Sequence, residues 1–369
     1  MKITKITTVP HSIDIDRHVG QVVNTKGFRF QSNILLIFIY TNKDICGIGE
    51  VSCSPDWSGE TNLGSKTLVE NYLAPQLLGE DPRQVKHCMN KISKTFSNPF
   101  TKAGIEMALL DIVGKFYNVP IYQLFGGIVR DRNIPLRFPV MPVGPKDSAN
   151  VAKRMVDKGF ETIKLKVGHD PLNYDIERLM AVREAVGPKI NLTVDANGGW
   201  TVNETIQIAP KLEELNVLFV EQPVNRHDLE GLSEIRKKIS LPIMADESVF
   251  TIQDALRCIK LRSADIISVY PGKNGGLMNT LAIASLAEGS GIQCAIGSNM
   301  EWDVGSAAMI HVTASIPNIC VEQYAADIIG IFFHPERAVK NQLTSNSAFA
   351  VVPEGPGLGV DLIDKFSAN

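Results

Sequence analysis

Three acidic residues recur at nearly equal spacing in the second half of the chain. Asp195 ends the run LTVD, Glu221 ends LFVE, and Asp246 ends PIMAD, with 26 and then 25 positions between them. If the three runs are neighbouring strands, the carboxylates meet at one edge and repel each other unless a cation joins them. Oxygen donors suit a hard ion, so we expect these residues to bind Mg²⁺. The alternative is that each acid caps the helix that follows it.

A pair of lysines lies in the preceding strand-like run. In TIKLKVG, the two-residue period of a strand places Lys164 and Lys166 on the same side. Each ammonium group, together with a nearby metal ion, is expected to lower the pKa of the other lysine toward neutrality. A neutral amine beside a metal-held carboxylate is a suitable base for a carbon acid. The alternative is a solvated pair of lysines at a strand end.

These motifs belong to a series of short apolar runs, each followed by a helical pattern, with a repeat near 26 residues. Eight strands alternating with helices favour parallel βα units that close into a barrel, with the acids at its C-terminal mouth. An open doubly wound sheet is the rival, but no glycine fingerprint follows the first run. The expected strands are Phe138–Val143, Thr162–Val167, Asn191–Asp195, Val217–Glu221, Ile243–Asp246, Asp265–Tyr270, Ile292–Gly297 and Ile319–Gln323.

The remaining segments differ from this pattern. Lys2–Val9, Asn33–Tyr40 and Gly47–Ser52 alternate like strands, and helical periodicity follows in 63–78, 84–96 and 101–117. We therefore expect an α+β capping domain over 1–125 and the barrel over 126–325. The last segment, 326–369, is too short to form a unit of its own and is expected to pack back on the capping domain.

Composition excludes several classes of protein. The 37 basic and 40 acidic residues give a net charge of −3 without a basic stripe, so nucleic acid is not an expected partner. The longest apolar run, Ile34–Tyr40, cannot span a bilayer, and no secretion signal is evident. The six cysteines form no C-x-x-C pair, which favours reduced thiols in a cytoplasmic chain. We expect no membrane association and no dinucleotide cofactor.

The quoted motifs resemble those of the enolase superfamily, in its muconate lactonizing (muconate cycloisomerase) subgroup, the mandelate racemase–muconate lactonizing enzyme family. The resemblance covers nearly the whole chain, including AGIEMALLDIVGKFYNVPIYQLFGG, the K-x-K, VDAN, VEQP and ADES runs, KNGG, GSNMEWDVGSAA and GPGLGV. It implies a modified (β/α)7β barrel under an α+β cap. It also implies that Mg²⁺ holds a substrate carboxylate while Lys166 removes the α-proton, with Lys164 as the carboxylate-contacting partner that lowers its pKa.

One departure from the family pattern concerns the sixth strand. Many relatives carry a second catalytic lysine in a segment like I-K-x-x-(K/R)-x-G-G, where this chain has VYPGKNGG. Tyr270 stands in the place of that lysine, and Lys273 matches the later basic position. Tyr270 either donates a proton or only shapes the pocket. Lys273 either reaches the substrate or packs on backbone carbonyls.

Further residues are expected to bind substrate or to orient the lysines. From the cap these are Arg17, Asp56 and Trp57, with Trp57 as a lid residue or, alternatively, a domain-interface residue. From the barrel they are Asn197, Asn299, Glu301 after strand seven and Glu322 on strand eight, the two acids alternatively forming buried ion pairs.

The expected function is Mg²⁺-dependent enolisation of a small carboxylate by a cytoplasmic homo-oligomer. Cycloisomerisation or syn dehydration suits a base on one face, because racemisation is easiest with acid–base groups on both faces. A racemase or epimerase of an amino-acid or proline-type carboxylate is the alternative if Tyr270 or Lys273 serves the second face. A non-catalytic binding protein on the same fold is a further alternative, which the retained lysines and acids disfavour.

Overall fold

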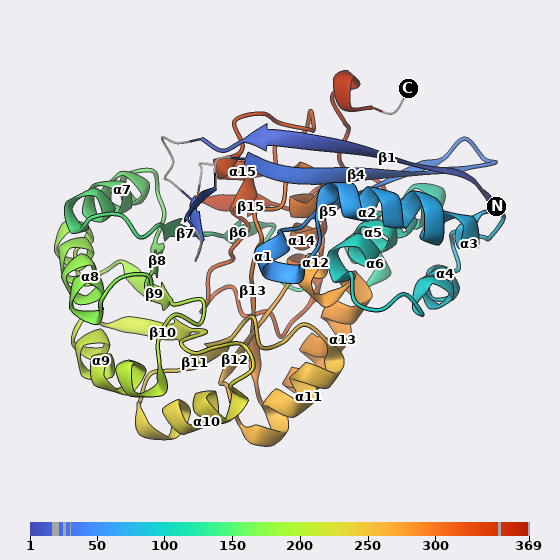
Figure 1. Ribbon diagram of the computed structural model, residues 1–369. Helices are drawn as coiled ribbons and strands as arrows, with labels where there is room; N and C mark the ends of the chain where they lie inside the picture. Colours follow the sequence, from blue (N-terminus) through green and yellow to red (C-terminus); the bar gives the residue numbers. More distant parts are fainter. Residues whose placement is uncertain (17–21, 25–26, 30, 346–347, 368–369) are drawn as a thin grey trace.

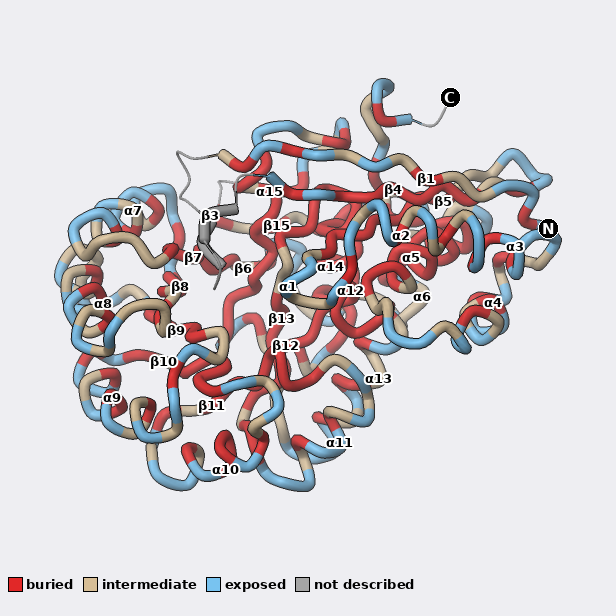
Figure 2. Tube along the Cα trace, in the orientation of Figure 1, coloured by how far each residue is buried: buried red, intermediate tan, exposed pale blue. Residues whose placement is uncertain are grey.

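The structure is a computed structural model that describes residues 1–369 except 17–21, 25–26, 30, 346–347 and 368–369. A curled sheet with helices on its outer side fills one part of the molecule, and long antiparallel strands with further helices lie across one end of it (Figure 1). Among the described residues, no helix is long and apolar enough to cross a membrane. The strands lie in the buried interior, while the outer helices are exposed on one side (Figure 2).

The curled sheet has seven parallel strands in consecutive order. They are β7 (Arg137–Val140), β8 (Thr162–Lys166), β9 (Asn191–Asp195), β10 (Val217–Glu221), β11 (Ile243–Ala245), β12 (Ile266–Val269) and β13 (Gln293–Ile296). The outer helices are α7 (Pro145–Asp157), α8 (Leu172–Val186), α9 (Val202–Glu214), α10 (Leu229–Lys238), α11 (Ile252–Leu261), α13 (Leu277–Glu288) and α14 (Asp303–Ser315), and a short α12 (Pro271–Asn274) follows β12. The predicted α/β barrel class is confirmed.

The prediction of a regular eighth strand over Ile319–Gln323 is wrong. Ile319 makes an isolated bridge to Cys294 of β13, and Ala326 makes another to Leu136 beside β7. Between these bridges the chain turns, with the Tyr324 amide bonded to the Cys320 carbonyl. The segment still fills the gap between β13 and β7, so it closes the barrel without ladder pairing over its whole length.

The N-terminal part packs a helix directly on an antiparallel sheet. The sheet has the order β1 (Ile3–Asp14), β4 (Gln31–Thr41), β5 (Cys46–Ser52), and a hairpin is formed by β2 (Val22–Asn24) and β3 (Gly27–Arg29). Gly49 of β5 lies so near α5 (Pro99–Tyr117) that an added Cβ would come 1.9 Å from the Gly104 carbonyl oxygen. Glycine is therefore required for this close approach. The other helices are α1 (Pro55–Ser58), α2 (Asn62–Leu68), α3 (Ala74–Leu77), α4 (Val85–Ile92) and α6 (Ile121–Leu124).

Two predicted helices differ from those observed. The helical pattern over 63–78 contains a π-helical segment, Val69–Leu73, between α2 and α3. The predicted helix over 84–96 ends at Ile92, because the chain turns through Ser97 and Asn98, which have left-handed φ values of 56° and 57°. Neither difference changes the position of α5 on the sheet.

The C-terminal segment contacts N-terminal elements through backbone and side-chain hydrogen bonds. The Asp16 amide donates to the Phe333 carbonyl over 2.8 Å, and the Leu358 amide donates to Asp111 Oδ1 of α5 over 2.9 Å. Short elements in this region are α15 (Gly330–Phe333), β14 (Thr344–Ser345) and β15 (Phe349–Val351), which pairs with β6 (Asn133–Pro135). The C-terminal residues thus hold the N-terminal sheet and α5 against the barrel.

Candidate active site

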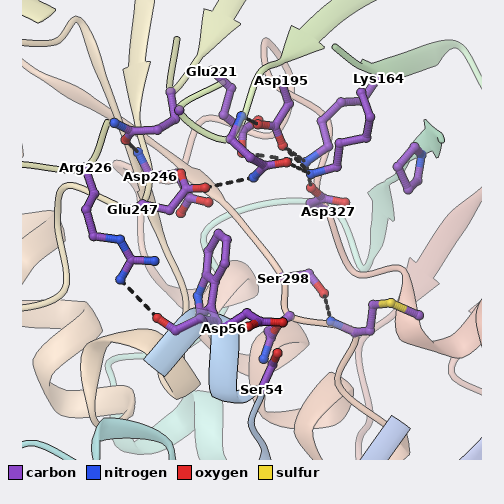
Figure 3. A pocket seen from close by; sticks show the side chains of 18 of the residues that line it. Ser54, Asp56, Lys164, Asp195, Glu221, Arg226, Asp246, Glu247, Ser298 and Asp327 are labelled. Atoms are coloured by element: carbon purple, nitrogen blue, oxygen red, sulfur yellow. Dashed lines mark hydrogen bonds and ion pairs between the residues drawn. The ribbon is translucent and has the colours of Figure 1, made fainter. Parts of the chain in front are cut away.

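A cavity lies where the barrel strands end and the N-terminal part covers them (Figure 3). Six carboxylates line it, and the lysines among its lining residues are both from β8. The acids are Asp56, Asp195, Glu221, Asp246, Glu247 and Asp327, and the lysines are Lys164 and Lys166. The sequence-predicted acids and lysines therefore meet at one place, at the carboxyl ends of the strands, where barrel enzymes have their active sites.

Strand register explains why these side chains meet. Lys166 pairs with Asp195 across β8 and β9, and Asp195 pairs with Glu221 across β9 and β10. Residues level with each other on adjacent parallel strands point the same way, so all three face the cavity. Lys164 Nζ lies 3.2 Å from Asp195 Oδ2 and 3.6 Å from Glu221 Oε1, and thus bridges two strand ends.

The charge of Glu221 responds to the two acids beside it. Burial raises the pKa of Glu221 to about 7, and the neighbouring Asp195 and Asp246 charges add to the shift, whereas Lys164 and Arg137 oppose it. Burial alone would raise the pKa of Asp195, but Lys166 and Lys164 hold it below its ordinary value. Carboxylates gathered in a buried site thus favour a cation beside them. Within the described residues, no three His, Cys, Asp or Glu side chains have their ligand atoms arranged so that they could hold a metal ion together. The lysine amines lie among the carboxylates instead.

The protein groups around Lys164 act on its pKa in the opposite direction to the sequence-based expectation, which counted a metal ion beside the lysines. Burial does lower its pKa, but the charges of Asp327, Glu221 and Asp195 outweigh burial and hold the pKa well above its ordinary value. Asp327 is in direct contact with the amine, and it also lies 3.3 Å from Arg137 Nη2. Lys164 is therefore a fixed, charged ammonium group.

Lys166 has a more open environment. Its Nζ donates to Asp195 Oδ2 over 2.6 Å and to Asn197 Oδ1 over 2.7 Å, and its side chain keeps 17% exposure, compared with 5% for Lys164. Asn197 in turn donates from Nδ2 to Glu247 Oε1 over 2.8 Å. Asn197 thus links the Lys166 amine to the Glu247 carboxylate.

Glu247, directly after Asp246, is a cavity residue that the sequence reasoning missed. Burial, followed by the charges of Asp246 and Asp195, raises its pKa to about 8. Its Oε2 is buried without a hydrogen-bond partner among the described residues. A buried polar atom with no partner in a cavity is available to an ion or a substrate group.

Tyr270 is wholly buried and does not line the cavity. Its ring lies 6.3 Å from that of Phe100, and its hydroxyl has no hydrogen-bond partner within the described chain. Burial, followed by the charges of Asp246, Glu301 and Glu247, raises the pKa of the phenol well above its ordinary value, and the Trp57 indole partly opposes this. The Tyr270 side chain therefore packs behind the residues that line the cavity and supports them.

Lys273, the other candidate for the second face, does not line the cavity. Its Nζ donates to Asp246 Oδ1 over 2.6 Å, to the Ser268 carbonyl over 2.7 Å and to the Asp246 carbonyl over 2.9 Å. These three bonds use the three protons of the ammonium group. These contacts agree with the alternative in which Lys273 packs on backbone carbonyls, and they add the Asp246 carboxylate, which neither alternative included.

The cap contributes Asp56 and Trp57 to the cavity, together with Ser54. Arg226, from the segment after β10, donates from Nη1 to the Trp57 carbonyl over 3.0 Å. Arg17 lies outside the described residues. Asp56 and Trp57 therefore stand where the sequence predicted substrate contacts.

Residues after β13 join the cavity to the cap. Asn299 lines the cavity and donates from Nδ2 to the Ser52 carbonyl of β5 over 2.8 Å. Glu301 is buried behind it and accepts from Ser298 Oγ over 2.6 Å, without lining the cavity. Burial raises the pKa of Glu301 to about 7. Its position indicates support of the 298–301 turn.

The prediction that Glu322 lies at the site is wrong. Its side chain is 69% exposed and pairs with Arg130 at 3.5 Å, outside the cavity. The chain turns after Ile319, so the acid that reaches Lys164 is Asp327, five residues later. Sequence reasoning also missed Arg137, a wholly buried arginine that contacts Asp327 and Glu221, and His169, a cavity residue after β8. The sequence signal that could have identified Arg137 and Asp327 was a single charged residue within an apolar run, LRF and AADII respectively.

Comparisons with known proteins agree with this geometry. The family model for the mandelate racemase / muconate lactonizing enzyme N-terminal domain matches residues 17–126, and the model called enolase C-terminal domain-like matches residues 147–366. A chloromuconate cycloisomerase of Cupriavidus pinatubonensis is 33% identical over 91% of this chain and 90% of its own length. An L-Ala-D/L-Glu epimerase of Clostridium acetobutylicum is 31% identical over 90% of this chain and 92% of its own length.

A solved structure gives the same fold over the whole chain. The dipeptide epimerase from Enterococcus faecalis, complexed with Mg and the dipeptide L-Leu-L-Tyr, superposes with a TM-score of 0.92 at 30% identity, covering 98% of this chain and 99% of that one. The matched relatives are cycloisomerases and epimerases, and barrel, cap and site are present here in one arrangement. This chain is an enzyme of the enolase superfamily and belongs to its mandelate racemase / muconate lactonizing enzyme family.

Proposed function

We propose that this enzyme binds Mg²⁺, removes the α-proton of a small carboxylate with Lys166, and completes the reaction on the same face of the substrate. Cycloisomerisation or syn elimination of water would then follow. The observation that carries the proposal is the placement of both β8 lysines beside Asp195, Glu221 and Asp246 in one cavity. Among the described residues, the lysines that line the cavity both come from β8.

Asp195, Glu221 and Asp246 are the residues that would hold Mg²⁺. Their oxygen donors match a hard cation, and the Asp195 and Asp246 charges beside Glu221 favour one. The unpaired Glu247 Oε2 and Asp327 Oδ1 show that the cavity has acceptor capacity beyond its lysines. When bound, the ion would polarise the substrate carboxylate and offset the negative charge that develops on enolisation. Access to Asp195 requires the partly exposed Lys166 amine to move off its carboxylate.

The two lysines take different parts in this proposal. Lys164 is buried among three carboxylates and stays protonated, so it serves as a fixed cation for the substrate carboxylate. Lys166 is nearer the open cavity and is oriented by Asn197, so its amine is the one that can receive the α-proton. Fixed positive charge beside a developing oxyanion is the largest contribution such sites make to rate.

The second face decides between the two outcomes. Lys273 is held by Asp246 and two carbonyls, and Tyr270 is buried behind the cavity wall. These contacts support the proposal that neither residue protonates a substrate from the side opposite Lys166. We therefore favour one-face chemistry over epimerisation, although several relatives are named epimerases.

The test is a screen of small carboxylates for exchange of the α-proton in D₂O, read by mass spectrometry, with and without Mg²⁺. Wild-type enzyme should exchange and then isomerise or dehydrate an active substrate without inverting its α-centre. Lys166→Ala should lose exchange by about 10²- to 10⁴-fold while still binding Mg²⁺. Full exchange in Lys166→Ala removes this residue as the base, and a racemic recovered substrate shows that the second face is active.

We also propose that the protein forms a homo-oligomer, because a cap over a barrel offers broad surface for the closed, symmetric assembly that most soluble oligomers adopt. Light scattering coupled to size-exclusion chromatography tests this. A mass equal to that of one 40.4 kDa chain would contradict it.

A further inference from the structure

The cap loop, residues 54–59, is anchored at both ends, and no residue of the helix in its middle is buried. Before it, Ser52 accepts the Asn299 side chain over 2.8 Å, and after it the Glu60 carboxylate accepts the Thr101 amide over 2.8 Å. Between these anchors, α1 has four residues, none of them buried. Gly59 ends it with a left-handed φ of 78°. The middle of the loop therefore depends on contacts across the cavity.

Arg226 supplies such a contact from the barrel side. Its Nη1 donates to the Trp57 carbonyl over 3.0 Å, and Figure 3 shows the guanidinium reaching toward the loop that carries Asp56. The guanidinium carbon lies 5.9 Å from the centre of the Trp57 ring and 5.6 Å from that of Phe250. One planar group thus hydrogen-bonds the loop backbone and lies near one aromatic ring on the loop and another on the barrel.

We propose that Arg226 is a latch, a positioning residue that holds the cap loop closed and keeps Trp57 at the cavity. The latch would set how tightly substrate is retained, while the lysines and carboxylates carry out the chemistry. The effect on substrate rests on the proposed function. The effect on the loop does not, because it concerns a contact within the protein alone.

The closed loop has a consequence for the cavity wall. The Trp57 indole N–H is buried and donates no hydrogen bond of good geometry to the described residues. The Tyr270 hydroxyl is likewise buried without a well-formed hydrogen bond in the described chain. Burial raises the pKa of that phenol, and the nearby Trp57 indole opposes part of the rise. Closure therefore brings an unused donor to the cavity, available to Tyr270 or to a substrate oxygen.

The loop itself can be observed through tryptophan fluorescence, without any substrate. Trp200 and Trp302 are 5% and 0% exposed, so the partly exposed Trp57 dominates quenching by acrylamide. Arg226→Met should raise the quenching constant at least about twofold, because the loop is released. Arg257→Met, which removes an exposed arginine from α11, should leave it unchanged. In a Trp57→Phe background, Arg226→Met should have no effect on quenching.

Kinetics then tests the consequence for substrate, with any carboxylate that exchanges its α-proton. Arg226→Met should raise KM about tenfold and change the exchange rate at saturation by less than about threefold. Arg226→Lys, which keeps a donor but not the planar stacking, should restore part of KM and part of the quenching protection. It also replaces Arg226→Met if that variant fails to fold, as judged by thermal unfolding.

Unchanged quenching in Arg226→Met overturns the latch, whatever the enzyme does to substrate. A fall in the saturated exchange rate with unchanged KM also overturns it. If no carboxylate exchanges at all, the proposed function fails, and the quenching experiment still decides the latch.

Discussion

Lys273 Nζ lies 2.6 Å from Asp246 Oδ1, and this wholly buried ion pair joins the segment after β12 to the end of β11. The lysine therefore orients a proposed metal ligand, although sequence comparison places it in a motif associated with catalysis. Groups that hold a ligand in this way usually change metal affinity tenfold or more when removed. Lys273 is thus a positioning residue for Asp246.

Lys273→Met is expected to weaken Mg²⁺ binding by about 10- to 100-fold, because Asp246 loses the partner that fixes its orientation. It should also lower the free energy of unfolding by about 3–5 kcal/mol, since a buried carboxylate is left without its cation. Calorimetric Mg²⁺ titration and denaturant unfolding measure these two effects. Lys260→Met, at an exposed position on α11, is the control. Unaltered metal affinity together with lost product formation would instead make Lys273 a catalytic group.

Tyr270→Phe is expected to leave both α-proton exchange and product formation within about threefold of wild type. The substitution removes only a buried hydroxyl that has no hydrogen-bond partner in the described structure, so the free energy of unfolding should not fall. Exchange is followed in D₂O and product by chromatography. Retained exchange with product formation lowered by about a hundredfold would show that the phenol protonates the second face.

The strands that carry the site were predictable because apolar runs and chemistry coincide there. Asn191–Asp195 and Val217–Glu221 are β9 and β10 with the predicted bounds. Their terminal acids were visible as single charges at the ends of buried segments. The sequence could not show that the eighth segment bends after Ile319, so the expectation for Glu322 failed and Asp327 was missed. That bend depends on the tertiary closure between β13 and β7.

Electrostatics was the other limit. The K-x-K pattern identified two lysines on one face, but the pKa of Lys164 depends on Asp327, which is 163 residues away in the chain. Likewise, no residue near Lys273 in the sequence indicates that its ammonium group donates a hydrogen bond to Asp246. Contacts between distant segments decide such shifts, and a single sequence does not reveal them.

Glu106→Gln is expected to reduce the pH dependence of stability. Glu106 of α5 is buried and accepts the Met278 amide over 2.9 Å, and burial raises its pKa from the ordinary 4.5 to about 7. As pH rises through this interval, the unfolded carboxyl loses its proton before the folded one does, so the wild type loses stability. Between about pH 4.5 and pH 7, the free energy of unfolding should fall by about 2 kcal/mol less in the variant than in the wild type, because a glutamine at position 106 does not titrate.

Denaturant unfolding at a series of pH values measures this difference. Glu184→Gln, which alters a glutamate on the outer helix α8, is a suitable control, with the wild-type pH dependence expected. Parallel pH profiles for wild type and Glu106→Gln would show that Glu106 has the same proton affinity in the folded and unfolded chains.

Calorimetric titration with Mg²⁺ tests the carboxylate site most directly. Asp195→Asn, Glu221→Gln and Asp246→Asn should each weaken binding by at least about tenfold, since each removes one anionic donor. Glu322→Gln, an exposed carboxylate outside the cavity, should bind like wild type. Equal Mg²⁺ affinity in wild type and all three cavity variants would contradict the assignment of these residues as the metal site.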